Sequence, residues 1–282
     1  MSPAVSTVIL TAAVVVMILV AMTYANGFLD TRLAENEYST NKQFMLTTGL
    51  QIDDIAWTIG RTQTVRYSSQ YGNMKFLSPA LNYTFEVELE GAPGVWVPVY
   101  SEDTGMILFN MPVSHYSISN NYFERLMPSS NGSFLQGGSS APVSHVFCVE
   151  KLPMDEGNYT RIAVVPSIRM LNSTIEGPLG TQTDYVKFYL PSLEQGNHLY
   201  KSQSITLTGK NITKIVQSGV SQVRINVTFS NGLPYSTQGF DYDFFNFDHT
   251  IDDYHASETV AFDSESVVEI YVGQVIVTLG KV

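Results

Sequence analysis

Residues 1–29 read MSPAVSTVILTAAVVVMILVAMTYANGFL, and none of these side chains is charged; the first ionised side chain is Asp30. Between Ala4 and Ala25 the residues are Val, Ile, Leu, Ala and Met, interrupted by a few Ser, Thr and Tyr residues. A helix of about 22 residues is ~33 Å long, which is enough to cross the hydrocarbon core of a bilayer. Because such a helix is apolar on every side, it must be buried in lipid or in other protein.

Three kinds of N-terminal segment have an apolar stretch of this length: a secretory signal, a membrane anchor and a polymerisation helix. A cleavable secretory signal normally has a positively charged n-region and a shorter apolar core, and neither is present in this sequence. A permanent single-span anchor usually has a basic cytoplasmic flank, and no Lys or Arg precedes the segment here. The third interpretation is a polymerisation helix, which resides in the membrane before assembly and then packs against copies of itself in a filament core.

Residues 2–12, Ser-Pro-Ala-Val-Ser-Thr-Val-Ile-Leu-Thr-Ala, resemble the N-terminus of archaeal type IV pilins and pilin-like surface proteins, which begin S-P-V-[IV]-[AS]-T-[VI]-[IL] before an apolar run. The resemblance covers about the first 25 residues and nothing specific in residues 70–282. It implies a short basic leader ending in Gly that a prepilin peptidase removes, so that Met1 is the first residue of the mature chain. Bacterial type IV pilins usually have a Glu near position five, where this chain has Val5, which favours the archaeal branch.

The same resemblance implies how the chain associates. It implies a homo-oligomer, a helical filament of identical subunits, whose apolar helices leave the membrane and pack together in the filament core. Alanines 12, 13, 21 and 25 would allow neighbouring helices to approach closely. The residues expected to form the polymerisation helix are Val5, Val8, Ile9, Ala12, Val15, Ile18, Leu19 and Ala25.

Beyond Asn26-Gly27 the pattern becomes amphipathic, and it predicts one helix from about Pro3 to Ile59 that is ~85 Å long. Apolar residues recur at near-helical spacing between charged ones, which predicts one buried stripe. Gly49 and Gly60 are the residues expected to bend or end this helix. The expected stripe comprises Leu29, Leu33, Phe44, Ile52, Ile55, Ala56 and Ile59.

After Arg61 the periodicity changes to short alternating runs rich in Val, Ile, Tyr, Phe and Thr, separated by Gly, Ser, Asn and Pro turn signals. The sequence therefore predicts an α+β chain: a polymerisation or membrane helix over residues 1–61, then an antiparallel β-sandwich or barrel-like head over residues 62–282. Residues 112–141 are polar and lack alternation, which favours a long surface loop. The predicted strands are Met74–Leu77, Tyr83–Leu89, Val95–Tyr100, Met106–Asn110, Val143–Leu152, Arg161–Met170, Tyr185–Leu190, Ser204–Thr208, Gln222–Phe229 and Val267–Leu279, the last one central in a sheet or packed on the helix.

Charge and composition exclude some classes of partner. The net charge of −11 argues against a nucleic-acid partner, because neutralising phosphates requires clustered Lys and Arg. The single cysteine, Cys148, excludes an internal disulfide and lies in an apolar run that favours a buried structural thiol. Six N-x-[S/T] triplets are a mild excess over chance and favour an extracellular head with N-linked glycans. The acceptors are Asn82, Asn131, Asn158, Asn172, Asn211 and Asn226.

An enzymatic function has little support in the sequence. No HExxH, GxSxG, GxGxxG or GxxxxGK[ST] motif occurs, so we expect no catalytic site and no organic cofactor. One segment, residues 241–255, is rich in Asp, and its carboxylates suit a hard cation such as Ca²⁺. The other interpretation of that segment is an acidic surface loop anchored by its aromatic residues. The candidate ligands are Asp241, Asp243, Asp248, Asp252 and Asp253.

These observations favour a structural subunit of an extracellular, archaeal type IV pilus-like filament that is inserted in the membrane before assembly and serves surface adhesion. The adhesion target is not specified by any motif. A motility filament belongs to the same class and is an alternative. From other classes, the alternatives are a membrane-anchored monomeric surface protein that binds a ligand or partner, and an extracellular enzyme.

Overall fold

The computed structural model describes residues 3–67, 69–113, 118, 122–129, 132–154, 157–176, 182–199, 202–229 and 255–280. One helix, α1 (Pro3–Ala56), precedes a head in which the described strands form one large, mostly antiparallel sheet, so the predicted α+β class is confirmed. The strands are β1 (Thr62–Arg66), β2 (Asn73–Leu89), β3 (Trp96–Pro112), β4 (Phe123–Met127), β5 (Leu135–Gly137), β6 (Ser144–Met154), β7 (Gly157–Pro166), β8 (Ile168–Glu176), β9 (Gln182–His198), β10 (Ser204–Phe229) and β11 (His255–Gly280).

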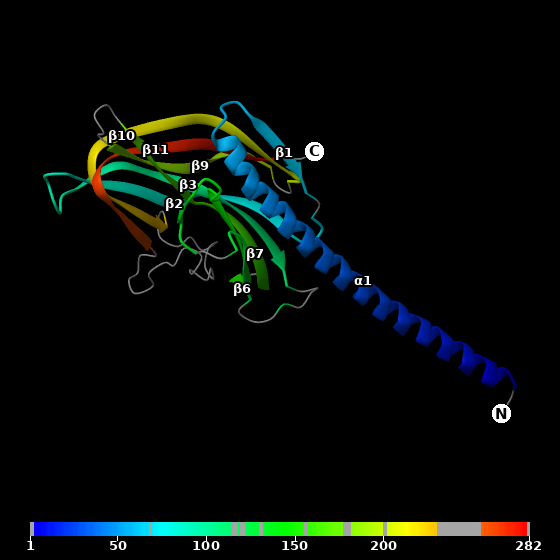
Figure 1. The fold of residues 1–282 in the computed structure, drawn as a ribbon. Helices are drawn as coiled ribbons and strands as arrows, with labels where there is room; N and C mark the ends of the chain where they lie inside the picture. Colours follow the sequence, from blue (N-terminus) through cyan, green and yellow to red (C-terminus); the bar gives the residue numbers. More distant parts are fainter. Residues whose placement is uncertain are drawn as a thin grey trace.

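The sheet is arranged around two long strands. Its order is β4-β6-β7-β3-β2-β10-β11-β9-β8-β5, and β1 pairs separately with β10. The first half of β10 pairs with β1 and the second half with β2, while β11 pairs with β10 along nearly its whole length. Only the β11–β9 and β5–β8 pairs are parallel among the described strands. Register shifts between Gln217 and Gln222 disrupt the β10 ladder, and β10 and β11 curve around the end of the head (Figure 1).

Two apolar cores lie on opposite faces of this sheet. Along β3, Met106 and Leu108 belong to one core, whereas Ile107 and Phe109 belong to the other. Successive side chains of a strand point to opposite faces, so a strand buried on both sides lies in the middle of the molecule. Among the described residues, the first core is formed by side chains of the strands together with Phe134, and the second is formed between the sheet and the C-terminal half of α1.

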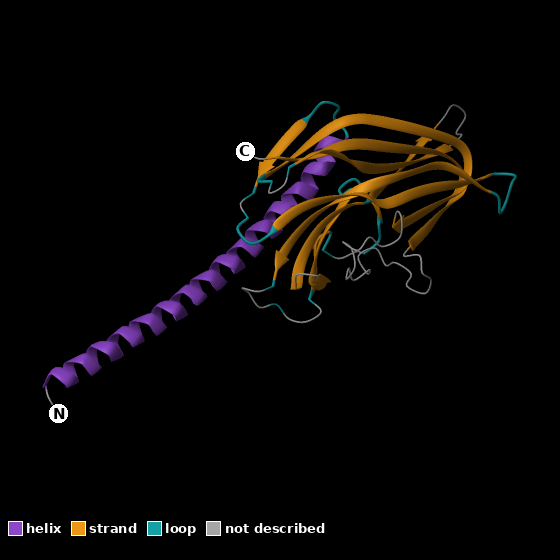
Figure 2. Ribbon diagram, turned by 180° about the vertical axis from the view of Figure 1, so that it is seen from behind, coloured by secondary structure: helices purple, strands orange, loops and turns teal. Residues whose placement is uncertain are grey.

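The helix covers one side of the head with its second half and extends beyond the head with its first half (Figures 1 and 2). It is continuous through Gly27 and Gly49, as the single-helix prediction required, and it ends at Ala56 rather than at Ile59. At Gly49 a Cβ would lie 2.7 Å from Val146 Cγ2 on β6, so glycine here allows close packing of the helix on the sheet.

The predicted buried stripe of α1 is partly wrong. Phe44, Ile52, Ile55 and Ala56 are buried as expected, but Leu29, Leu33 and Ile59 are half or more exposed. Leu29 precedes Ala34, the first buried residue of the helix; Leu33 lies on a different face of the helix from Ala34; and Ile59 follows the end of the helix. Helical periodicity identifies a face of the helix and does not show how far along that face the partner extends. The buried face comprises Ala34, Asn41, Phe44, Met45, Thr48, Gly49, Ile52, Ile55 and Ala56.

Several strand boundaries also differ from the prediction. Two strands, Met74–Leu77 and Tyr83–Leu89, were predicted on either side of Pro79, because Pro cannot donate a ladder hydrogen bond. In the structure they form one strand, β2, which continues past Pro79 through a register shift between Leu77 and Leu81. Strand β10 is continuous where two strands with a gap were expected. The predicted loop over residues 112–141 contains β4 and β5, which are short and pair with β6 and β8. Such short strands are specified by the neighbouring backbone and not by alternation of their own side chains. By contrast, β11 is central as predicted, between β10 and β9.

His145 is a buried polar residue on β6, on the same face of the strand as Phe147 of the first core. Its side chain has no exposed surface, and its Nε2 lies 3.3 Å from the Gln136 side-chain nitrogen. Burial disfavours the charged imidazolium, and the nearby Arg125 disfavours it further, so the pKa of His145 is lowered from 6.5 to about 3. The folded head therefore holds this imidazole in its neutral form.

This burial predicts acid sensitivity of the head. Between pH 6.5 and about pH 3 the unfolded chain binds a proton on His145 that the folded chain does not bind. The free energy of unfolding should therefore fall as the pH falls through this window, by about 1.4 kcal/mol per pH unit from this one group. In urea titrations followed by tryptophan fluorescence, His145→Gln should show a shallower pH dependence than the parent chain. Parallel pH dependences for the two chains would contradict the assignment.

Candidate assembly surface

The first half of α1 is an apolar surface that the head leaves uncovered. The segment is long and apolar enough to cross a membrane, and none of its most apolar window is buried within the chain. All eight residues of the predicted polymerisation helix are exposed, and the six large ones among them are 48–68% exposed. Removing one large apolar side chain from water is favourable by about 1.5–3 kcal/mol. This part of the helix therefore requires lipid or protein around it.

Two threonines in this segment have their hydroxyl groups hydrogen-bonded within the helix. The hydroxyl of Thr11 donates to the carbonyl of Thr7 at 2.8 Å, and the hydroxyl of Thr23 donates to the carbonyl of Leu19 at 2.9 Å. Threonine hydroxyls that bond back to the preceding turn have a partner within the helix itself. They can therefore enter an apolar environment without an unsatisfied donor.

From Ala34 onward the helix is fixed to the head by apolar burial. The buried positions recur at intervals of three, four and seven, so they lie on one face that contacts β3, β6, β7, β10 and β11. Two polar residues on this face are bonded within the helix: Asn41 Nδ2 donates to the Glu37 carbonyl at 2.9 Å, and Thr48 Oγ1 donates to the Phe44 carbonyl at 3.0 Å. The second half of α1 is thus part of the core of the head.

The carboxylate of Glu37 binds the segment that leads from β1 to β2. It accepts hydrogen bonds from the backbone N–H groups of Gln70, Tyr71 and Gly72 at 3.0–3.2 Å and from the Ser69 hydroxyl at 2.8 Å. Hydrogen bonds to an ionised acceptor are about twice as strong as neutral ones. Glu37 therefore holds this connection against α1 close to the point where the helix leaves the head.

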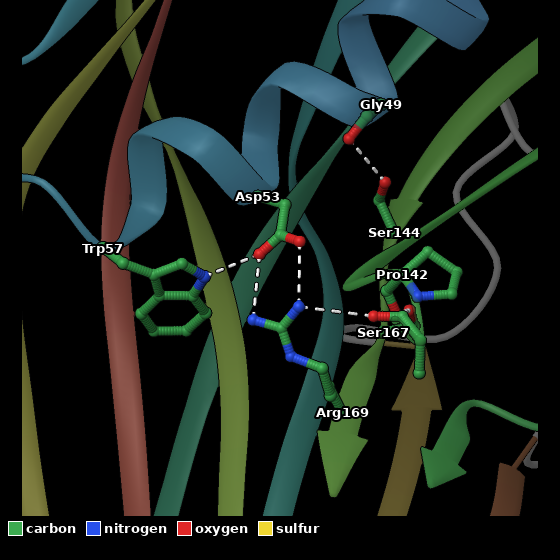
Figure 3. Close-up of polar contacts among 8 residues, drawn as sticks. Gly49, Asp53, Trp57, Pro142, Ser144, Ser167 and Arg169 are labelled. Atoms are coloured by element: carbon green, nitrogen blue, oxygen red, sulfur yellow. Dashed lines mark hydrogen bonds and ion pairs between the residues drawn. The ribbon is translucent and has the colours of Figure 1, made fainter. Parts of the chain in front are cut away.

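A second polar contact holds the C-terminal end of α1 (Figure 3). The Asp53 carboxylate accepts two hydrogen bonds from the Arg169 guanidinium, at 2.9 and 3.0 Å, and a third from Trp57 Nε1 at 2.8 Å. One helical turn earlier, the Ser144 hydroxyl donates to the Gly49 carbonyl at 2.8 Å. Bidentate Arg–carboxylate geometry restricts orientation as well as distance. These contacts restrict the orientation of the helix against β6 and attach it to Arg169 on β8.

Two glycines bring the sheet backbone close to the last turn of α1. At Gly209 on β10 a Cβ would lie 2.4 Å from the Thr58 carbonyl oxygen, and at Gly273 on β11 it would lie 2.4 Å from that of Ala56. The backbones of Gly60 and Gly209 also bond directly, N to O at 2.8 Å. Any larger residue at either glycine would push the helix end away from the sheet.

Sequence reasoning did not find the residues that orient the helix. Glu37 and Asp53 are charged residues beside the buried stripe and have no distinguishing pattern, and Arg169 is distant from both in the sequence. Their pairing depends on how the sheet folds against the helix. The only sequence feature that pointed to these contacts was the presence of two carboxylates, Glu37 and Asp53, beside the apolar stripe of a long helix.

The predicted glycan acceptors fall into different environments. Asn158, Asn172 and Asn211 are exposed, whereas Asn82 and Asn226 are partly buried in strands, and Asn131 lies outside the described residues. The five candidate cation ligands, Asp241, Asp243, Asp248, Asp252 and Asp253, also lie outside the described residues, as does the side chain of Cys148. Within the described part of the chain, no group of three or more His, Cys, Asp or Glu side chains is arranged to hold a metal ion.

Comparisons of the chain with protein-family models, with curated proteins and with solved structures found no match. Functional inference for this chain therefore depends on its N-terminal residues and on the geometry of α1 and the head.

The Glu37 contact predicts a specific loss of stability. Glu37→Gln removes the charge from an acceptor of three backbone N–H groups, so the free energy of unfolding should fall by about 1–3 kcal/mol in urea titrations of the full chain in detergent. Glu35→Gln is the matched control, because Glu35 forms an exposed pair with Arg32, and such pairs contribute about 0–1 kcal/mol. Equal effects of the two variants would show that Glu37 does not hold the β1–β2 connection.

Proposed function

We propose that this chain is the structural subunit of an extracellular, archaeal type IV pilus-like filament. The observation that carries the proposal is the division of α1 into an apolar half that the head leaves exposed and a half that is built into the head core. The resemblance of residues 2–12 to archaeal pilin N-termini supports the same function. In this proposal the chain is a homopolymer and its activity is assembly, not catalysis.

Assembly in this proposal exchanges one apolar environment for another. Before assembly the first half of α1 lies in the membrane, and the head lies outside the cell. In the filament, the same Val, Ile, Leu and Ala side chains contact the helices of neighbouring subunits in place of lipid. Dispersion and close packing then drive association, because lipid and protein are similarly apolar. Dissociation into water would expose the whole segment and is strongly unfavourable.

The fixed orientation of α1 on the head is what makes this segment useful for assembly. A continuous helix held by apolar burial, by Glu37 and by the Asp53–Arg169 pair transmits the arrangement of the packed N-terminal halves to the heads. In the filament the heads then form the outer surface. We assign an adhesion role in preference to motility because the head is large and three of its glycan acceptors, Asn158, Asn172 and Asn211, are exposed.

A membrane-anchored monomer that binds a partner at the cell surface is the second candidate. The same apolar segment favours it, because one helix long enough to cross a membrane also suffices as an anchor. The two candidates differ in what must surround the helix, since an anchor requires only lipid, whereas a filament requires close contact between helices.

A charge within the apolar half should abolish filaments. Val15→Asp or Leu19→Asp places a carboxylate where it costs about 2.5–3.5 kcal/mol in a membrane and where no cation is available to pair with it in a helix core. Negative-stain microscopy of sheared surface material should show no filaments, while protease resistance shows that the head remains folded. Val95→Asp is the control, because Val95 is similarly exposed but lies in the β2–β3 turn, at the opposite end of the head from the N-terminus (Figure 1). Normal filaments from either helix variant would refute the proposal.

Bulky apolar substitutions distinguish the filament from the anchor. Ala21→Leu combined with Ala25→Leu keeps the segment apolar, so the chain should remain in the membrane fraction. Overpacking a close helix contact costs about 1–3 kcal/mol per site and is repeated in every subunit, so the filament yield should fall at least about tenfold. Val16→Leu combined with Val20→Leu has the same spacing but adds less volume and should assemble normally. Unchanged filaments from the alanine pair would mean that the helices do not approach closely.

A further inference from the structure

Two of the N-x-T triplets lie directly opposite each other in the centre of the sheet. In the antiparallel pair of β2 and β10, Asn82 is the register partner of Thr228, and Thr84 is the register partner of Asn226. Both strands are paired on both sides here, β2 by β3 and β10 by β11. The four side chains are partly exposed on the same face and alternate with the buried residues Tyr83, Phe85, Ile225 and Val227.

The side-chain amides of these two asparagines are already used within the sheet. Asn82 Nδ2 donates to Asp103 at 3.0 Å, and its Oδ1 accepts from the hydroxyl of Thr84 at 2.9 Å. Asn226 Nδ2 donates at 3.1 Å to Glu86, which also binds Arg224 at 2.7 Å. A polar ladder of this kind stabilises the central strands through cross-strand pairs. It also engages one N–H of the nitrogen atom to which a glycan would be joined, so that attaching a glycan would disturb the ladder.

Asn172 and Asn211 differ from Asn82 and Asn226 in exposure and in hydrogen bonding. Both are exposed, and neither side chain makes a hydrogen bond within the described residues. Among those residues, the stretch of β10 over residues 211–217 pairs only with β11, because the pairing of β10 with β1 ends at Thr208 and its pairing with β2 begins at Val220. Likewise, the stretch of β8 over residues 172–176 pairs only with β9. Each acceptor thus lies at the start of a strand stretch with one unpaired edge.

We propose that Asn172 and Asn211 carry N-linked glycans that cover these two strand edges, while Asn82 and Asn226 stay unmodified and stabilise the sheet through their side-chain hydrogen bonds. The inference depends on the extracellular location in the proposed function. The modification joins the anomeric carbon of a glycosyl donor, a lipid-linked sugar phosphate or diphosphate, to Asn Nδ2. The anomeric C–O bond breaks, the phosphate or diphosphate leaves with the electron pair, and the amide nitrogen loses one proton.

Glycans that cover a strand edge would prevent the sheets of neighbouring heads from pairing with each other. Unpaired backbone N–H and C=O groups at a strand edge are a template for pairing with another sheet. A filament holds many copies of the head at high local concentration, and contact between two filaments would bring many such edges together. The β8 edge also presents Ile175, which is 54% exposed. A bulky hydrophilic glycan at the start of each edge keeps the neighbouring backbone solvated.

The positions can be tested by glycopeptide mass spectrometry of the full chain purified from the membrane fraction and from surface material of its native host. Peptides containing Asn172 and Asn211 should carry glycans, and those containing Asn82 and Asn226 should have their unmodified masses. A glycan on Asn82 or Asn226, or unmodified Asn172 and Asn211, would overturn the assignment. Since the membrane fraction is measured independently of assembly, that result would leave the filament proposal intact, and failure to find filaments would leave the glycan assignment intact.

The role of the glycans needs a second comparison. The double variant Asn172→Gln and Asn211→Gln should still assemble, but its filaments should associate side by side in negative-stain images. Thr174→Ser and Thr213→Ser keep both triplets as acceptors, and Thr174→Ser keeps a hydroxyl near Asp184, so these controls should give single filaments. Single, unbundled filaments from the double variant would show that the glycans do not protect the edges.

Discussion

Burial of one face of α1 against the sheet is the interaction on which the rest of the structure depends. From Ala34 to Ala56 the helix supplies a large part of the second core, and without it the inward faces of β3, β7, β10 and β11 would be exposed. The same helix continues without a break toward the N-terminus, where no part of the head meets it. One element therefore belongs to the core of the head over half its length and presents an exposed apolar surface over the other half.

Apolar and polar contacts contribute differently to the attachment of α1 to the head. The apolar stripe supplies the free energy of attachment, but such contacts are non-directional and would tolerate sliding or rotation of the helix. Glu37, at the point where the helix leaves the head, and Asp53, near its end, restrict those movements through directional hydrogen bonds. Gly209 and Gly273 allow the last turn to approach the sheet backbone. The direction in which the apolar half projects is thus determined by residues more than 20 Å away from its middle, at ~1.5 Å per helical residue.

The head shows a comparable division between its centre and its margins. Central strands carry outward-facing polar side chains that hydrogen-bond across neighbouring strands, such as Asn82 with Asp103 and Asn226 with Glu86. At the margins, stretches such as residues 172–176 pair on one side only within the described chain. If the chain assembles as we propose, these margins are the places where pairing between the sheets of neighbouring heads has to be prevented.

The sequence by itself determined the α+β class, the single long helix, the exposed apolar segment and the central position of the last strand. These features depend on local composition and on periods of 3.6 and 2, which a sequence records directly. The tertiary structure alone decided that Leu29, Leu33 and Ile59 are exposed, that β10 is one strand, and that Arg169 meets Asp53. It also separated the acceptor triplets of the sheet centre from those at its edges. Each of these outcomes depends on which distant segment lies alongside, and no local pattern contains that information.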